Sequence, residues 1–229
     1  MTVDGLHLVY FADPMCSWCW GFSPVIEAIR ERYGESLPAR LIMGGLRPGT
    51  RAPMDEAAKA STRSHWEHVH AASGQPFDLG FFARQGFIYD TEPASRAVVL
   101  ARRGDQARGF AYLRRVHAAF YAENRDVTDP AVLADLAGEL GFERDAFLEM
   151  LSSDELMQET RQDFATAHGA GIGGFPTLIA GAGSDGSYAL VTQGFQAVER
   201  ILPALDRWLG LKRAAPAGCG DPASLPEPA

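Results

Sequence analysis

The hydrophobic pattern of the chain begins with a strand, a helix and a second strand. Residues 6–11 form an aliphatic and aromatic run of strand length, closed by the turn residues Asp13-Pro14. Apolar residues then recur every three or four positions from Phe22 to Ile29, which predicts an amphipathic helix stopped near Gly34. A second strand is expected at 39–43. The two strands should be parallel, because a right-handed crossover helix joins them.

From residue 51 to residue 163 the pattern is helical throughout. Asp, Ser and Pro mark the expected helix starts, and glycines mark the ends. The expected helices are 54–73, 92–103, 106–123, 130–140, 144–151 and 154–168.

The sheet pattern returns after a glycine-rich stretch at residues 169–174. Strands 177–180 and 188–193 are expected to form a hairpin, followed by a helix at 196–209. Pro203 should kink that helix or sit in irregular first turns. We therefore predict an α/β protein with three parts: a discontinuous sheet domain formed by residues 1–50 and 164–213, a helical insertion domain at 51–163, and a disordered tail at 214–229.

Composition and charge narrow the classes of function. The 229 residues are 46% hydrophobic and 22% charged, as in an ordinary globular protein. With 21 basic and 29 acidic residues the net charge is -8, so we expect neither a nucleic-acid nor a membrane partner. The N-terminus lacks the pattern of a secretory signal, and no apolar run reaches the roughly 18 to 20 residues of a membrane helix. A cytoplasmic location is expected.

The strongest chemical signal is Cys16-Ser17-Trp18-Cys19, where a strand ends and a helix begins. Free amides and the positive end of a helix dipole stabilise a thiolate, and in such motifs the thiol pKa falls from about 8.5 to roughly 3.5–7.5. Cys16 would be the nucleophile, and the more buried Cys19 would resolve the mixed disulfide. Half of a zinc site is a weaker alternative, because no second cysteine pair is present. Inert core cysteines are also disfavoured, since helix entries are partly exposed.

Two segments resemble a known family. Residues 11–22, FADPMCSWCWGF, are similar to the active-site segment of the DsbA-like branch of the thioredoxin superfamily, most of all to its cytoplasmic FrnE-like members. Residues 173–178, GGFPTL, resemble the family's loop with a cis-proline before the third strand. The order of elements also matches over roughly residues 3 to 210. The resemblance implies a thioredoxin-like fold with an all-helical insertion domain.

The resemblance also implies site residues. Cys16 and Cys19 would be catalytic, and Ser17, Trp18, Phe175 and Pro176 would bind substrate. A cis bond before Pro176 would leave the main chain around Phe175 free to pair with an extended substrate, and Pro176 would keep metals away from the cysteines. An ordinary trans proline opening a strand is the alternative.

The chain departs from periplasmic DsbA proteins in three respects. These are the Ser-Trp dipeptide between the cysteines, Phe175 before the proline, and the lack of an export signal. Because the dipeptide tunes the relative stability of thiolate and disulfide, a strongly oxidising role does not carry over.

Other candidate residues have simpler interpretations. Trp20 should pack in the core. Asp13 should be a turn residue that ends the first strand; the alternatives are a helix cap or a nearby charge that raises the thiol pKa. His65, His68 and His70 on one helix indicate a solvated or substrate-facing surface more than a metal site. Residues 181–186 fit a dinucleotide glycine pattern but precede a strand, so we expect a hairpin turn. Cys219 should be a free thiol in the tail, or a partner for Cys16.

The sequence thus predicts a thiol-disulfide oxidoreductase acting on protein or small-molecule thiols and disulfides. We expect no metal and no tightly bound cofactor, with glutathione as a candidate redox partner; the oligomeric state is open. One alternative is a glutathione-dependent isomerase or transferase of the 2-hydroxychromene-2-carboxylate isomerase (kappa) type, although that chemistry does not call for Cys19. A cofactor-free isomerase and a non-catalytic interaction module that uses Trp18 and Phe175 are further alternatives.

Overall fold

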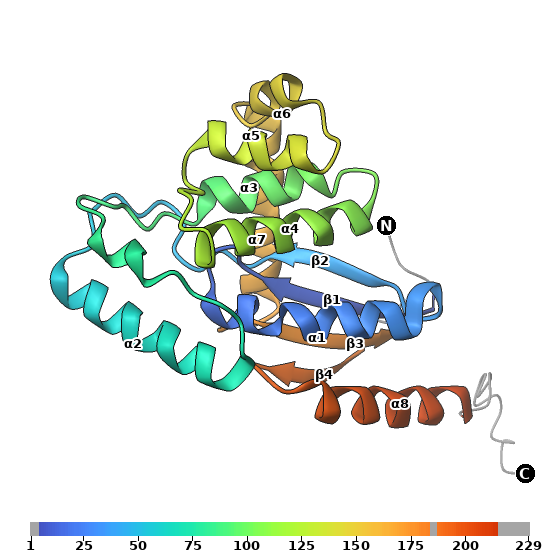
Figure 1. Cartoon of the computed structure of the whole chain (residues 1–229). Coiled ribbons are helices and arrows are strands. Elements are labelled where there is room, and N and C mark those ends of the chain that lie inside the picture. Colours follow the sequence, from blue (N-terminus) through green and yellow to red (C-terminus); the bar gives the residue numbers. More distant parts are fainter. Residues whose placement is uncertain (1–4, 184–186, 215–229) are drawn as a thin grey trace, which may run out of the picture.

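A four-stranded mixed sheet forms the centre of the molecule (Figure 1). The computed structural model describes residues 5–183 and 187–214. The strand order is β2-β1-β3-β4, with β1 at Leu6–Ala12, β2 at Ala39–Met43, β3 at Thr177–Ala182 and β4 at Tyr188–Gln193. Strand β1 pairs parallel with β2 and antiparallel with β3, and β3 pairs antiparallel with β4. The parallel pair and the hairpin confirm the sequence-based predictions.

The described ranges contain eight α-helices, and all eight were predicted. They are α1 (Ser17–Tyr33), α2 (Glu56–Ser73), α3 (Glu92–Ala101), α4 (Gln106–Tyr121), α5 (Pro130–Glu139), α6 (Arg144–Met150), α7 (Asp154–Gly169) and α8 (Val198–Ala214). Their ends differ from prediction by a few residues. Short 3-10 helices at Gly34–Ser36 and Leu79–Ala83 were not predicted.

The last helix differs most from its expected length. Helix α8 continues to Ala214 and contains Pro203 in its second turn. The predicted disordered tail lies outside the described residues, apart from Ala214, and so does Cys219. Gly181 belongs to β3, which leads to the antiparallel strand β4, so a hairpin and not a dinucleotide-binding helix follows it. The division of the chain into two domains stays a prediction.

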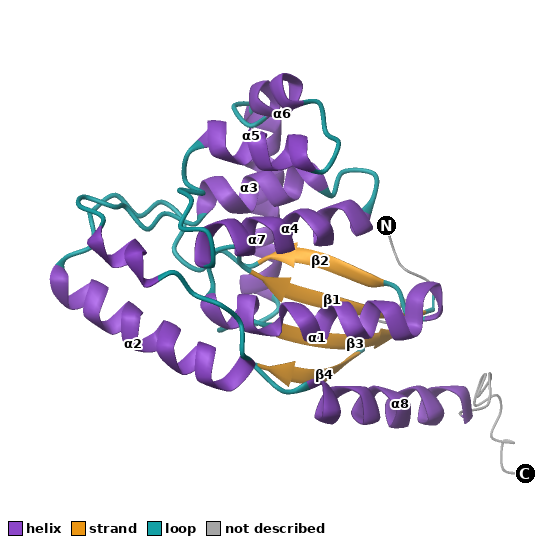
Figure 2. Cartoon of the chain, viewed as in Figure 1, coloured by secondary structure: helices purple, strands orange, loops and turns teal. Residues whose placement is uncertain are grey.

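Helices cover the sheet on both faces (Figure 2). Because side chains alternate along a strand, Leu8, Tyr10 and Ala12 of β1 face the large core that includes α1 and α8. Val9 and Phe11 face the opposite side, where they pack with α7. The carboxyl end of β1, where the chain enters the cysteine motif, is therefore enclosed by helices.

A buried ion pair joins the helical segment to β2. Arg102, directly after α3, makes a bidentate contact with Asp163 on α7, at 2.6 and 2.7 Å. Asp163 also accepts from the amide of Met43 at 2.7 Å, and Arg102 donates to the carbonyl of Leu41. Each side chain is 9% exposed. These contacts fix the end of β2, which leads directly into the candidate site.

Helix α2 is anchored by an aromatic cluster. Trp66 is 1% exposed, and five aromatic rings lie within 6 Å of its ring. They belong to Phe77, Phe81, Phe82, Phe120 and Tyr121. Further along the same side of α2, Val69 and Ser73 border Gly21 of α1.

Candidate active site

Cys16 and Cys19 lie at the start of α1, one helical turn apart. Cys16 occupies the N-cap position, and its carbonyl accepts from the amides of Cys19 and Trp20 at 3.0 and 3.1 Å. Both cysteines are free thiols. Cys19 is fully buried and Cys16 is 6% exposed, so the expected difference in burial is present. The expectation that the helix entry would be partly exposed is wrong for Cys16 and for Ser17, which is 8% exposed, because neighbouring loops fold over them.

The proline loop lies directly against Cys16. The Phe175-Pro176 peptide bond is cis. The Cys16 thiol donates to the carbonyl of Phe175, with 3.5 Å between sulfur and oxygen. Strand β3, which begins at Thr177, pairs with β1, and this pairing brings together two segments that are about 160 residues apart in the sequence.

The Phe175 ring rests on the backbone of Gly44, just after β2. A methyl group at Gly44 would lie 2.0 Å from two atoms of that ring. Overpacking of this kind costs roughly 1–3 kcal/mol and displaces the obstructing group. Glycine at this position is therefore needed for the loop to reach Cys16.

We expect Gly44→Ala to lower the reactivity of Cys16 several-fold, since the displaced Phe175 carbonyl can no longer contact its thiol. Stability should fall by roughly 1–3 kcal/mol. Thiol-reaction kinetics and urea unfolding measure the two effects. Gly173→Ala is the matched control, because a methyl there meets no atom within 4 Å in the described structure. Equal behaviour of the two variants would contradict this assignment.

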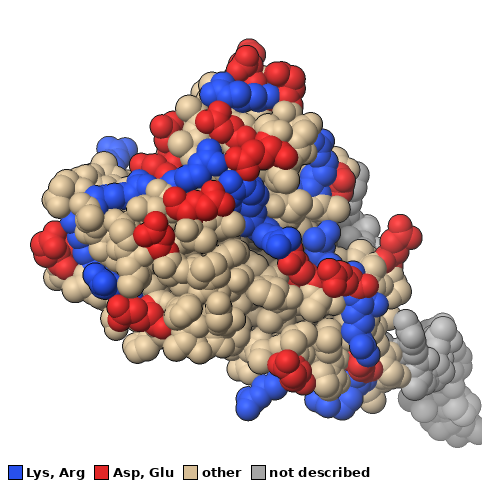
Figure 3. Space-filling model, in the orientation of Figure 1, with Lys and Arg blue, Asp and Glu red and all other residues tan. Residues whose placement is uncertain are grey.

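A cavity of about 300 Å³ opens beside Cys16. Its floor includes Cys16, Trp18 and Phe175, and its polar wall comes from α2 and from the loop after β2. The wall residues are Arg47, Ser61, Thr62 and His65. Figure 3 shows few charged side chains on the surface between α1 and α2 in this view. Cys16 is thus reached through a mainly uncharged opening with one cation, Arg47, among the described lining residues.

The side chain of Trp18 contacts α2 and the segment that follows β4. Its indole N–H donates to Nε2 of His65 on α2, at 3.0 Å, and its ring lies 5.8 Å from that of Phe195. Of the three histidines on α2, His65 alone lines the described cavity, while Nδ1 of His70 lies 2.8 Å from the carbonyl of Gln75. Trp20 is buried, as expected, and donates to the carbonyl of Pro76.

Asp13 is a buried part of the site and not an exposed turn residue. Its carboxylate accepts from the amides of Met15 and Leu46, at 2.9 and 2.7 Å. Burial raises the pKa of Asp13 to about 6, although the two amides, Leu46 first, act in the opposite direction. The prediction that Asp13 is simply a turn residue is therefore incomplete, because its carboxylate also connects the turn to the loop after β2.

His117, on α4, lies beneath the same turn. Its Nε2–H donates to the carbonyl of Asp13 at 3.1 Å, and its Nδ1 lies 3.3 Å from the hydroxyl of Ser23. That hydroxyl donates to the carbonyl of Cys19 at 3.2 Å. Burial lowers the pKa of His117 to about 4, so the imidazole is neutral at pH 7. The helical segment thus supports the backbone on both sides of the cysteine pair.

The environment of Cys19 favours its neutral form. Burial raises the pKa of the Cys19 thiol, and the adjacent Cys16 raises it further. The amide of Asp13 acts in the opposite direction by hydrogen bonding. The two thiols therefore differ: Cys16 lines the cavity, whereas Cys19 lies below it in an environment that keeps its thiol protonated.

The fold and the paired thiols define the class of protein. A Cys-x-x-Cys pair at the first helix of a strand-helix-strand unit, facing a proline loop, is typical of thioredoxin-like proteins. The family model described as DSBA-like thioredoxin domain matches residues 7–206, and the chain belongs to this family. The predicted fold class is confirmed.

Solved structures agree with this family. A crystal structure of a candidate protein disulfide isomerase from Nitrosomonas europaea is 38% identical, with a TM-score of 0.84, and covers 91% of this chain and 99% of its own. The cytosolic disulfide reductase DsbM from Pseudomonas aeruginosa is 27% identical, with a TM-score of 0.73, over 90% of this chain and 99% of its own. A structure of DsbM with GSH also matches, at 26% identity, with a TM-score of 0.67, over 90% and 97% of the two chains.

More distant curated relatives are adapter proteins. The ClpXP adapter protein SpxH of Bacillus subtilis is 24% identical over 174 residues, or 76% of this chain. The match spans 57% of the length of that relative.

Two features are absent from residues 5–183 and 187–214. These ranges hold no cluster of three or more His, Cys, Asp or Glu side chains suited to a metal ion. None of their helices combines the length and hydropathy of a membrane span.

Proposed function

We propose that this protein is a thiol-disulfide oxidoreductase that uses the Cys16-Cys19 pair. The observation that supports this most is the asymmetry of the two thiols, with Cys16 lining a cavity and Cys19 fully buried one turn below. In the reducing direction, the Cys16 thiolate attacks a substrate disulfide, forms a mixed disulfide and releases the first substrate thiolate. Cys19 loses its proton and attacks the Cys16 sulfur. This step releases the second thiolate and leaves a Cys16-Cys19 disulfide.

Substrate binding is proposed for the surfaces around Cys16. Trp18 and Phe175 supply apolar contact on the two sides of the Cys16 thiol, and Ser17 lines the same cavity. The Phe175 carbonyl lies at the Cys16 sulfur, and we propose that Pro176 belongs to the stretch of main chain that pairs with an extended substrate segment.

Glutathione is the proposed redox partner. The DsbM structure with GSH supports this, because it matches over 90% of this chain. Arg47 is well placed for a carboxylate of the tripeptide, since it lines the cavity that contains Cys16. We also propose a cytosolic location, supported by the cytosolic description of DsbM.

The test is turnover of a disulfide substrate. The wild-type protein should reduce insulin disulfides with glutathione as the recycling thiol, or form disulfides in a reduced substrate with glutathione disulfide as the recycling oxidant. A Cys219→Ser variant is the matched control and should keep this activity. The redox potential of the Cys16-Cys19 pair in the wild-type protein, measured against glutathione, gives the preferred direction of electron transfer. Equal activity of wild type and Cys16→Ser would contradict the proposal.

Two alternatives predict different outcomes in the same experiments. A kappa-type glutathione isomerase or transferase would bind glutathione tightly and without dependence on Cys19. The second alternative, a non-catalytic interaction module, is suggested by the likeness to the SpxH adapter proteins. Such a module would bind its partner equally well after both cysteines are replaced. The buried second thiol beside Cys16 favours the redox proposal over both.

A further inference from the structure

The hydroxyl of Tyr10, on β1, lies in the core below the cysteine pair without a hydrogen-bond partner. Tyr10 is 1% exposed, and its hydroxyl oxygen makes no hydrogen bond to any of the described residues. A buried hydroxyl usually has a partner, because an unsatisfied one costs roughly 1–3 kcal/mol. We therefore expect this hydroxyl to gain a hydrogen-bond partner in a state of the cysteine pair other than the resting dithiol.

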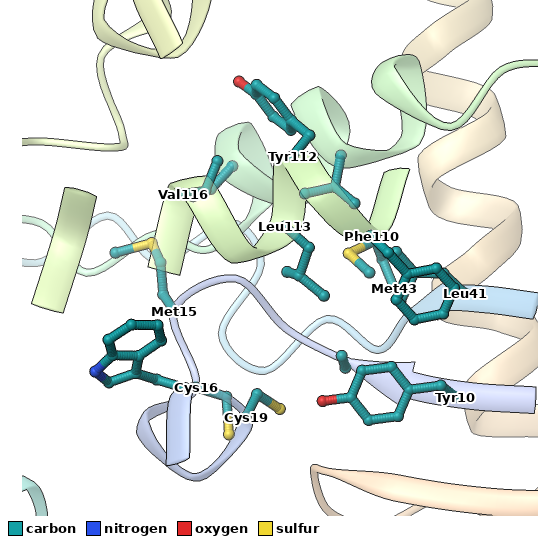
Figure 4. Close-up of a cluster of buried hydrophobic side chains, with 14 of the residues drawn as sticks. Tyr10, Met15, Cys16, Cys19, Leu41, Met43, Phe110, Tyr112, Leu113 and Val116 are labelled. Atoms are coloured by element: carbon teal, nitrogen blue, oxygen red, sulfur yellow. The ribbon is translucent and has the colours of Figure 1, made fainter. Parts of the chain in front are cut away.

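Packing fixes the direction of this hydroxyl. The Tyr10 ring is stacked between Phe22 of α1 and Phe110 of α4, with centroids 5.8 and 6.1 Å away. Figure 4 shows the hydroxyl pointing toward the sulfur of Cys19. Cys19 is also the first of the neighbouring groups whose charge raises the pKa of the Tyr10 hydroxyl, so the two groups lie close together. The two rings prevent the phenol from swinging away.

The chemistry of the pair favours one direction of donation. Burial raises the pKa of Tyr10 well above its ordinary value, and the nearby Cys19 and Cys16 raise it further, so the phenol keeps its proton. A neutral thiol is a weak acceptor, whereas a thiolate is a strong one. The titratable groups that face Cys19 are Cys16, Asp13 and Tyr10, with neutral His117 one hydroxyl away. Tyr10 is the one side-chain O–H donor among them.

We propose that Tyr10 donates a hydrogen bond to the Cys19 thiolate and so accelerates the resolving step. The proposal rests on the proposed function. As Cys19 gives up its proton to solvent, the charge on its sulfur gains the Tyr10 hydroxyl as a side-chain donor in addition to the amide of Asp13. The thiolate then attacks the Cys16 sulfur, the substrate thiolate leaves with the electron pair, and the Tyr10 hydroxyl is again without a partner in the disulfide. Tyr10 remains protonated throughout.

The test separates the two chemical steps in full-length protein with Cys219→Ser, to which Tyr10→Phe is added. Dithiobis(nitrobenzoate) is the probe, because it releases one coloured thiolate when Cys16 attacks and a second when Cys19 resolves the adduct. Tyr10→Phe keeps both ring stacks. It should leave the first, concentration-dependent phase unchanged, slow the second, unimolecular phase roughly tenfold, and move its pH midpoint upward.

Tyr112→Phe is the matched control. Tyr112 is also buried, but its hydroxyl donates to the carbonyl of Leu133 in the helical segment. This variant should lose stability and keep both phases, whereas Tyr10→Phe should keep its stability in urea. An unchanged second phase in Tyr10→Phe at every pH overturns the role of Tyr10. Release of only one thiolate by the parent protein would instead overturn the proposed function.

Discussion

Replacing Cys19 with serine should arrest the protein as a mixed disulfide between Cys16 and its substrate. Cys16 lines the cavity and can still be attacked, but the group that displaces the substrate is gone. Turnover of protein disulfides should fall by at least roughly a thousandfold, as is usual when one member of a cooperating catalytic pair is lost. Intact-protein mass spectrometry after incubation with glutathione disulfide should show one bound glutathione per chain.

The Cys16→Ser variant provides the contrast. Its remaining site thiol, Cys19, is fully buried and protonated, so it should form no adduct under the same conditions. Both variants should carry Cys219→Ser, so that each chain offers a single site thiol. An adduct on Cys19, or full turnover in the Cys19→Ser variant, would contradict the assigned roles. If glutathione alone restored turnover to Cys19→Ser, resolution would depend on external thiol, as the kappa-type alternative requires.

Local patterns predicted the elements of this fold because each depends on nearby residues. The run at residues 6–11 and the cysteine motif define the strand, turn and helix entry that the structure shows. Aspartates before Ala107 and Ala131 do cap their helices, accepting from those amides at 2.8 Å. Element ends were less accurate. Helix α8 continues to Ala214, where an end at residue 209 was expected, and it does so although Pro203 in its second turn removes one hydrogen bond of the helix.

The site is less predictable because it is assembled from distant segments. His117 reaches the turn at Asp13 across 104 positions, and His65 reaches Trp18 across 47. No spacing rule connects such pairs. Burial of Asp13 follows from the loop after β2, which donates the Leu46 amide to it. An aspartate three residues before the first cysteine of a Cys-x-x-Cys motif, with a lone histidine on an apolar helix face, is the signal that could have suggested this network.

Asp13 and His117 should give opposite pH dependences of stability, and single substitutions should reveal them. The folded-state pKa of Asp13, about 6, lies above its ordinary value of 3.8. Its contribution is therefore fully present below about pH 4 and is lost as the pH rises through 6. The folded-state pKa of His117, about 4, lies below its ordinary value of 6.5. Its contribution is present above pH 6.5 and is lost as the pH falls through 4.

Each shift corresponds to about 3 kcal/mol, so in the wild type the two effects nearly cancel across this window. The Asp13→Asn variant, left with His117, should lose about 3 kcal/mol of unfolding free energy on acidification from pH 6.5 to 4. The His117→Gln variant, left with Asp13, should gain a similar amount from pH 6 to 4. Urea unfolding at closely spaced pH values measures both slopes, and the other carboxylates cancel because they are common to all three proteins. Once the wild-type slope has been subtracted from each, slopes of the same sign in the two variants would show that these groups do not titrate as a buried, opposed pair beneath the cysteines.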